Sequence, residues 1–322
     1  MFRMCVSLCL VAVFCGIAFS GGQAGADDMA VEKFDGGVHV TLGGKPFTDY
    51  LIRTGPKPIL WPIIGPGGHE MTRNYPMKLV QTEKRDHPHQ RSLWFTHGSV
   101  NGIDFWSETP ASGKQLHREF LKCEAANGKA TISTANDWVS YDNKKQLEDV
   151  RTVTLSGDAD QRVIDFDITL KASEGPVRFG DTKEGTMGLR VPTALDARQL
   201  SGTRGEIVNS EGQKDGAAWG KQAPWVDYHG VLDGDPVGVT IMNHPSSFRS
   251  PTYWHVRDYG LFAANPFGLH DFHNSKDKDE GTYTLPAGET MTLRYRFLFH
   301  RGNEKDGHVA EAYQAYAKEP RP

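Results

Sequence analysis

The sequence has 322 residues, enough for one large β domain or two smaller domains, each with its own hydrophobic core. Its 36 Lys and Arg and 40 Asp and Glu residues are scattered and leave a formal net charge of −4, which argues against nucleic acid as a partner. Three of the four cysteines lie in the apolar segment at the start, so only Cys123 remains in a mature chain and no internal disulfide is expected.

Residues 1–26 have the pattern of a secretory signal peptide. Arg3 precedes an apolar run, and small residues up to position 26 provide an Ala-x-Ala cleavage site. The run is too short to cross a bilayer, and no later segment has the roughly 20 apolar residues that a membrane helix needs. We therefore expect a periplasmic or secreted protein without membrane insertion, whose residues 27–322 form a single β-sandwich domain.

The first half of the chain reads as a series of strands. Residues 31–52 alternate apolar and polar positions around Gly-rich turns, which predicts a hairpin, and the prolines and glycines of 55–76 predict a long ordered loop. From 102 to 173, runs with a period of two are separated by turn residues such as Asn127-Gly128 and Asp142-Asn143. Four or five successive antiparallel strands are expected there.

The second half continues this pattern. A loop over 195–230 precedes strands at 237–244 and 259–266, and a hairpin is expected at 281–302. Only 308–319 reads as a helix, because four apolar positions fall on one helical face: Val309, Ala312, Tyr313 and Tyr316. The sequence thus predicts an all-β fold, a large antiparallel β-sandwich with one short C-terminal helix.

The segment 85–106, RDHPHQRSLWFTHGSVNGIDFW, concentrates three histidines, two arginines and two aspartates among aromatic residues. In an extended chain His87, His89, Arg91 and His97 would share one face, and Pro88 favours an edge strand or a loop. Imidazoles titrate near neutral pH, so this segment is a candidate site for acid–base chemistry.

Further polar and aromatic groups are expected to converge on the same pocket. A buried glutamate can transfer protons near neutral pH, arginine can anchor anionic oxygens, and Trp and Tyr faces stack on sugar rings. Together they predict a site for a small polar molecule or an oligosaccharide. The predicted catalytic residues are His87, His97, Glu184 and His244, and the predicted substrate-binding residues are His89, Arg91, Arg190, Tyr228, Tyr253, Trp254, His255, Arg257 and Asn265.

Other interpretations remain open. Trp254 can belong to the core, and Arg190 can simply pair with an acid. His87, His89 and His97 can alternatively hold a copper or zinc ion with an open position for water or substrate, whereas the main hypothesis needs no cofactor. The sequence has neither a Gly-x-Ser-x-Gly nucleophile motif nor a phosphate-binding glycine loop.

Five segments carry a resemblance to a known family. DHPHQRSLWFTHGSVNGIDFW, DTKEGTMGLRVP, PWVDYHG, MNHPSSFRSPTYWHVRDYGLFAANPFG and YRFLFHRG resemble secreted bacterial proteins labelled "methane oxygenase PmoA", over nearly all of the mature chain. A particulate methane monooxygenase subunit bears transmembrane helices, so the label conflicts with this sequence. The resemblance implies a β-sandwich similar to the galactose mutarotase supersandwich, in a family plentiful in bacteria that degrade complex polysaccharides.

Mutarotase-like enzymes use a histidine as acid and a glutamate as base, and polysaccharide lyases and hydrolases share their sandwich. By this analogy His87, His97 or His244 would be the acid and Glu184 the base. The resulting hypothesis is a carbohydrate-active enzyme of the lyase, hydrolase or epimerase type, acting on a sugar or an oxidised glycoside. The alternatives are a non-catalytic carbohydrate-binding sandwich and the copper or zinc enzyme.

Overall fold

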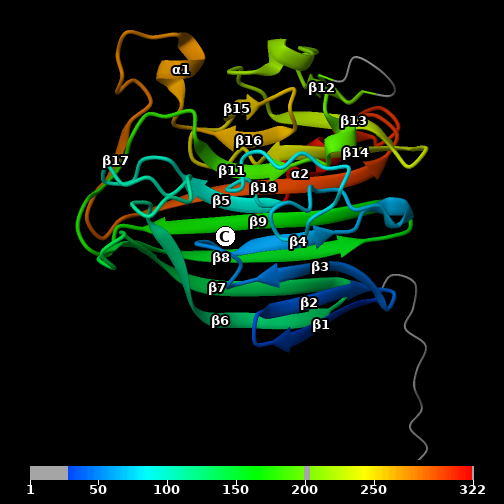
Figure 1. The fold of residues 1–322 in the computed structure, drawn as a ribbon, viewed down its shortest axis with the longest axis horizontal. Helices are drawn as coiled ribbons and strands as arrows, with labels where there is room; N and C mark the ends of the chain where they lie inside the picture. The colour runs from blue at the N-terminus through cyan, green and yellow to red at the C-terminus, as the bar shows by residue number, and fades with distance from the viewer. Residues whose placement is uncertain (1–27, 199–203, 321–322) are drawn as a thin grey trace, which may run out of the picture.

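The computed structural model describes residues 28–198 and 204–320, which form two stacked antiparallel sheets of eight strands each (Figure 1). The first sheet has the order β1 (Met29–Phe34), β2 (Gly37–Leu42), β3 (Lys45–Leu51), β4 (Ile59–Ile63), β5 (Leu93–His97), β11 (Gly185–Arg190), β16 (Leu261–Asn265) and β15 (Tyr253–Val256). The second has the order β12 (Glu206–Asn209), β13 (Trp225–Leu232), β14 (Asp235–Asn243), β18 (Thr290–Arg301), β9 (Gln161–Lys171), β8 (Lys145–Gly157), β7 (Lys129–Val139) and β6 (Lys114–Ala126). The short strands β10 (Val177–Phe179) and β17 (Tyr283–Leu285) pair with each other. The predicted antiparallel β-sandwich is confirmed, and the predicted signal peptide lies outside the described residues.

One hydrophobic core fills the space between the sheets. Val38 and Val40 of β2 in the first sheet and Phe166 and Ile168 of β9 in the second belong to the same buried cluster. Alternate residues of each strand point into it, and burying each large apolar side chain contributes about 1.5–3 kcal/mol.

The core also contains a buried ion pair. On β8, Asp149 and Arg151 have the same inward parity as the apolar residues around them, and both side chains are at most 1% exposed. The Asp149 carboxylate accepts hydrogen bonds from Asn136 Nδ2 (2.9 Å) and Trp138 Nε1 (2.7 Å) as well as from Arg151. Gln115 accepts a further hydrogen bond from Arg151 (2.9 Å), so both charges are paired within a polar network.

The strand meander from β6 to β9 is as predicted, with Asn127 and Gly128 at positive φ in the first turn. The prediction of a strand at 102–108 is wrong. Asp104 Oδ1 accepts hydrogen bonds from the backbone N–H groups of Trp106 (2.7 Å) and Ser107 (3.0 Å), and this local pairing turns the chain. The expected loop at 195–230 instead contains β12 and part of β13.

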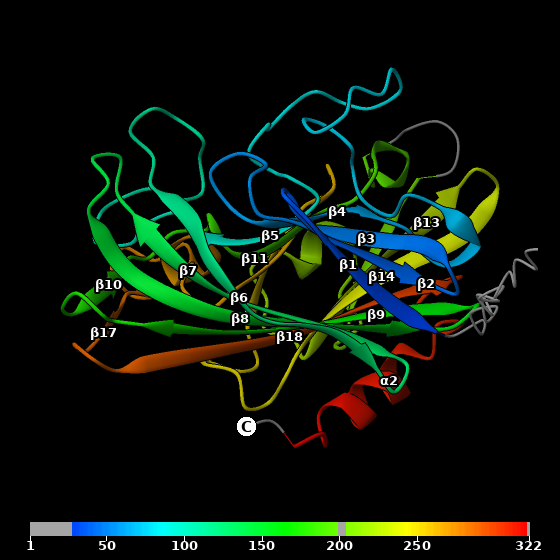
Figure 2. The same cartoon turned by 90° about the horizontal axis from the view of Figure 1, so that it is seen from below.

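The predicted C-terminal helix is α2 (Val309–Tyr316), whose apolar face packs against Met242 and Leu298 on the outer face of the second sheet. Figure 2 shows α2 on one side of the sandwich and the long loop between β4 and β5 projecting on the other. A second helix, α1 (Leu269–His273), was not predicted. Among the described residues, no helix has the length and apolar character needed to cross a membrane.

Candidate functional site

On the outer face of the first sheet, two small residues lie between two residues with large ring side chains and form the floor of the site. The strand register places Trp94, Gly188, Ala263 and His255 in one row across β5, β11, β16 and β15. A Cβ atom at position 188 would lie 2.6 Å from Trp94 Cζ2, so only glycine lets the indole lie across the sheet. Trp94 and Ala263 pack in a cluster separate from the main core, which identifies this face as the outer one.

Tyr259, in the turn between β15 and β16, is contacted by several of the side chains that lie on this outer face. The His87 ring stacks on it with a centroid distance of 5.1 Å and an interplanar angle of 6°. The guanidinium groups of Arg190, Arg198 and Arg257 lie 5.0, 5.1 and 5.7 Å from its ring centroid. Sequence reasoning missed this residue, since nothing local distinguishes a tyrosine in such a turn.

Glu184 acts electrostatically on Tyr259. Burial is the main reason why the pKa of Tyr259 is raised, and the negative charge of Glu184 also raises it, against the opposing effects of Gln90 and two arginines. The Glu184 side chain is 36% exposed and pairs with Lys183 at 3.4 Å. Glu184 is thus within electrostatic range of Tyr259, on which His87 stacks.

His87 is held in an unusual conformation. Its φ of 45° is left-handed, which is uncommon for a residue other than glycine. Its carbonyl accepts hydrogen bonds from Arg73 Nη2 (2.9 Å) and from the backbone N–H of Gln90 (3.0 Å). Its Nδ1 lies 3.2 Å from Asp86 Oδ2, so Nε2 remains to meet a ligand.

Asp86 is in turn fixed by two arginines. Arg73 and Arg190 both donate to its Oδ1, at 2.5 and 2.9 Å. Partial burial acts to raise the pKa of Asp86, but the charges of Arg190, Arg73 and His87 outweigh it and the pKa is lowered. The carboxylate is therefore ionised at neutral pH and can orient the His87 ring.

Two other histidines here are neutral at pH 7. Burial, with the charges of Lys57 and His87, lowers the pKa of His89 to about 4. Burial, with the charges of Arg257 and Lys183, lowers the pKa of His255 to about 3. These two rings can accept or donate hydrogen bonds but are unsuited to act as acids near neutral pH.

Arg257 differs from the neighbouring arginines in its partners. Arg190 bonds to Asp86 and Gln90, and Arg198 lies 3.6 Å from a carboxylate oxygen of Asp196. The half-buried Arg257 guanidinium lies over the rings of Trp219 and Tyr259, and it forms no ion pair with a carboxylate of the described residues. It lines a cavity of about 250 Å³ with Trp219 and Asp258, where an anionic group could pair with it. Because Arg257 also contacts the Tyr259 ring, this cavity and the surface beside it are called the hollow around Tyr259.

Residues 37–314 match the model of a family described as DUF6807, a family of unknown function. The chain belongs to DUF6807. No curated protein matches the sequence, and the "methane oxygenase PmoA" label expected from the resemblance does not appear among the matches.

Solved structures similar to this DUF6807 protein include the GH36 α-galactosidase AgaA of Geobacillus stearothermophilus, with 10% identity and a TM-score of 0.41, over 86% of this chain and 41% of that chain. The chain therefore spans about two fifths of that enzyme. A galactose mutarotase-like protein from Clostridium acetobutylicum is 10% identical, with a TM-score of 0.36, over 85% of this chain and 99% of that chain. At this similarity neither structure assigns an activity to the DUF6807 protein.

The predicted site residue Asn265 has a positioning role. Its Nδ2 donates to the carbonyls of Thr182 (2.9 Å) and Lys183 (3.0 Å), and its Oδ1 accepts the N–H of Phe267 (2.9 Å). It therefore fixes the turn that presents Glu184, and its own polar groups are used within the protein.

His97 does not join His87 and His89, so the prediction of a shared face is wrong. The positive φ of Ser92 (54°) separates the loop from β5, which is a central strand and not an edge strand. His97 points into the core between Phe179 and Phe267, and its Nε2 lies 2.8 Å from the Gly180 carbonyl. The three-histidine metal hypothesis thereby loses one ligand.

Three more predicted residues are structural in this DUF6807 protein. His244 is at the end of β14 in the second sheet, where its ring packs against Tyr316 of α2. Tyr228 is fully buried and accepts a hydrogen bond from the N–H of Ala197 (3.2 Å). Trp254 is also fully buried and donates to the Ala223 carbonyl (2.9 Å), so none of the three reaches the hollow.

Two others are engaged by side chains of the protein itself. Arg91 forms a bidentate ion pair with Glu108, which also binds Lys57. Tyr253 bonds through its hydroxyl to His273 Nε2 of α1 at 2.9 Å. The structure thus places His87, Arg190 and Arg257 against the Tyr259 ring. His89 lies next to His87, His255 accepts a hydrogen bond from Trp219 Nε1 (3.0 Å), and Glu184 is within electrostatic range of Tyr259.

The burial of His97 predicts a loss of stability in acid. Burial lowers the pKa of this side chain to about 4, so the unfolded chain binds a proton below about pH 6.5 that the folded chain does not. The contribution of neutral His97 to the free energy of unfolding is complete above pH 6.5 and decreases as the pH falls. His97→Gln keeps a donor for Gly180, and we expect urea unfolding to show about 3 kcal/mol less loss of stability between pH 7 and pH 4 than in wild type. Equal losses in both proteins would contradict this.

Proposed function

We propose that this protein is a carbohydrate-active enzyme that uses acid–base chemistry on a sugar bearing an anionic group, bound in the hollow around Tyr259. The observation that carries the proposal is the conformation and environment of His87. Its backbone is in the left-handed region, its ring is oriented by Asp86, and it stacks on Tyr259. The negative charge of Glu184 acts on the same tyrosine. Strained, oriented side chains cluster at functional sites.

In this proposal His87 and Glu184 have complementary roles. Glu184 takes a proton from the substrate, and His87 delivers one through Nε2 to the ring or leaving oxygen. Both side chains are partly exposed, so a substrate can reach them without unfolding of the chain. Which bond of the substrate is broken or inverted decides whether the enzyme is a lyase, a hydrolase or an epimerase.

Binding of the sugar is proposed to rest on the aromatic rings and on Arg257. The ring of Trp219, which lines the cavity, offers a stacking surface for a sugar ring, and Arg257 lies 5.8 Å from the centroid of that ring and 5.7 Å from the centroid of Tyr259. Because its guanidinium has no carboxylate partner among the described residues, a substrate carboxylate would supply one. This favours an oxidised sugar over a neutral one.

A paired sugar panel tests this proposal. Each neutral sugar or glycoside is compared with its uronate by calorimetry for binding and by NMR for turnover. Arg257→Gln is expected to raise KM for the uronate about 10-fold to 100-fold, because a hydrogen bond to a charged group contributes about 1.5–3 kcal/mol. The neutral sugar should change little.

Arg118→Gln is the matched control, since Arg118 is an exposed, ion-paired arginine on the second sheet and should leave both constants unchanged. Equal effects of Arg257→Gln on neutral and anionic sugars would contradict the anionic substrate. Binding without turnover in wild type, unchanged in Glu184→Gln, would establish the carbohydrate-binding alternative.

A further inference from the structure

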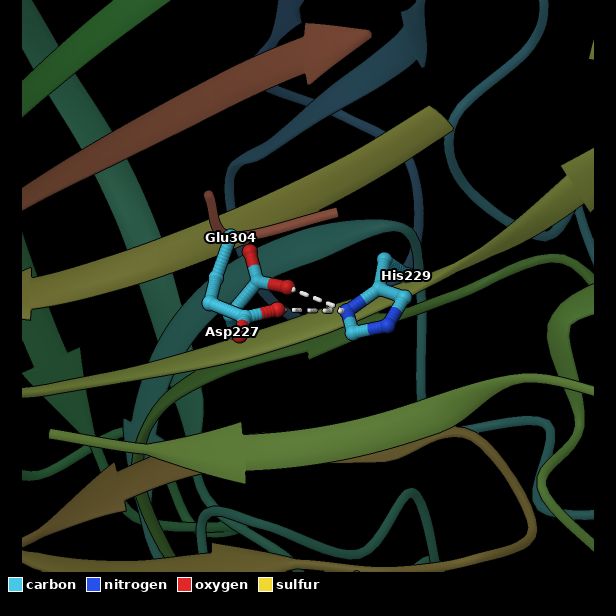
Figure 3. Close-up of side chains that lie close together, drawn as sticks. All are labelled: Asp227, His229 and Glu304. Carbon is cyan, nitrogen blue, oxygen red and sulfur yellow. Dashed lines mark hydrogen bonds and ion pairs between the residues drawn. The ribbon is translucent and has the colours of Figure 1, made fainter. Parts of the chain in front are cut away.

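A second cluster of chemically capable side chains lies on the outer face of the second sheet. Asp227 and His229 are two residues apart on β13, and Glu304 belongs to the turn that connects β18 to α2. One ligand atom of each lies within 4.8 Å of the others, the one such group of three in the part of the chain that the structure describes. Figure 3 shows His229 Nδ1 facing both carboxylates, at 2.7 Å from Asp227 Oδ1 and 3.9 Å from Glu304 Oε2.

The Asp227 carboxylate is firmly oriented. Its Oδ2 accepts hydrogen bonds from Thr240 Oγ1 (2.7 Å) and from His300 Nε2 (2.8 Å), which leaves Oδ1 directed at His229. A Cβ atom at Gly238 would lie 2.4 Å from the His300 ring and 3.1 Å from His229 Cβ, so glycine makes room for both rings. Outer-shell hydrogen bonds of this kind orient the ligands of metal sites.

The cluster is reachable from solvent. Asp227 is fully buried, whereas the side chains of His229 and Glu304 are 15% and 20% exposed. Two carboxylate oxygens around one imidazole nitrogen form a position that favours a positive charge, and a metal ion can take the place of the proton on Nδ1.

We propose that Asp227, His229 and Glu304 bind a divalent transition-metal ion, with Zn²⁺ as the best match. One imidazole and two carboxylates satisfy three positions of a zinc site, whereas Ca²⁺ takes six to eight oxygens and Mg²⁺ an octahedral shell. The hollow around Tyr259 is on the outer face of the other sheet, so the ion is structural. It ties the turn that carries Glu304, and hence the start of α2, to β13.

Titration of the untagged protein, stripped of metal with a chelator, tests this site. Calorimetry with Zn²⁺ is expected to show one site per chain, and Co²⁺ is expected to give visible absorption bands on binding. The thermal unfolding midpoint should rise with Zn²⁺, because an ion that binds only the folded state stabilises it. Glu304→Gln keeps the side-chain shape and should weaken Zn²⁺ binding about tenfold or more and abolish the rise.

The matched control is His69→Gln. His69 also lies near two carboxylates, but through different nitrogens: Nε2 is 2.8 Å from Asp235 and Nδ1 is 3.7 Å from Asp233. One ion cannot bridge them in the same way, so His69→Gln should bind Zn²⁺ like wild type. Circular dichroism without metal shows whether Glu304→Gln folds, and His229→Gln replaces it if it does not. Failure of wild type to bind Zn²⁺, or unchanged binding in both Glu304→Gln and His229→Gln, would overturn the proposal.

Discussion

Substitution of His87 by glutamine is expected to lower kcat for the sugar substrate by about 10²-fold to 10⁴-fold, the contribution typical of a positioned general acid or base. Glutamine can keep a hydrogen bond to Asp86 but cannot transfer a proton near neutral pH. KM should change less than kcat, because the aromatic rings and Arg257 remain in place. Steady-state kinetics on the substrate found with the sugar panel measures both constants.

His39→Gln is the matched control for this experiment. His39 also bonds through Nδ1 to an aspartate, Asp49 (2.8 Å), and stacks on an aromatic ring, Phe34 (4.1 Å), but on β2, outside the proposed site. Its substitution should leave kcat within a factor of about two, since it loses only a surface contact. An equally active His87→Gln enzyme would remove His87 from the mechanism and leave Glu184 without its acid.

The largest effect on stability is expected from Asp149→Asn. The substitution keeps the shape of the side chain but leaves the buried Arg151 guanidinium without a counter-charge, and breaking such a pair costs about 3–5 kcal/mol. Urea unfolding followed by tryptophan fluorescence measures the loss.

Two comparisons separate charge from packing. Glu124→Gln breaks an ion pair with Lys122 on β6 in which both side chains are about half exposed, and should cost less than about 1 kcal/mol. Replacing both Asp149 and Arg151 by apolar residues of similar volume should cost far less than Asp149→Asn, because no buried charge is then left unpaired. A double variant as unstable as Asp149→Asn would show that shape, and not charge, dominates there.

The fold could be predicted because its strands follow the simple alternation rule. Residues such as Ile164, Phe166 and Ile168 are buried at every second position, and the pattern shows directly in the sequence. Where polar residues hold structural positions, the rule fails. In β13, Val226 and Tyr228 do alternate with Asp227 and His229, but the glycines and Pro224 around this short segment favoured a loop.

The site was predicted less completely, for two physical reasons. The shared face of His87 and His97 assumed an unbroken extended chain, and the positive φ values of His87 and Ser92 break it. The role of Tyr259 depends on contacts with segments about 70 to 170 residues away in the sequence, such as His87 and Arg190, and a single sequence does not reveal such contacts.

The position of α2 has a practical consequence. Because this helix covers the face of the sandwich opposite to the loop that carries His87, a surface or a fusion partner attached beyond α2 would leave the hollow around Tyr259 open (Figure 2). The protein can therefore be immobilised through that end for ligand-capture experiments, with the proposed site directed toward the solution.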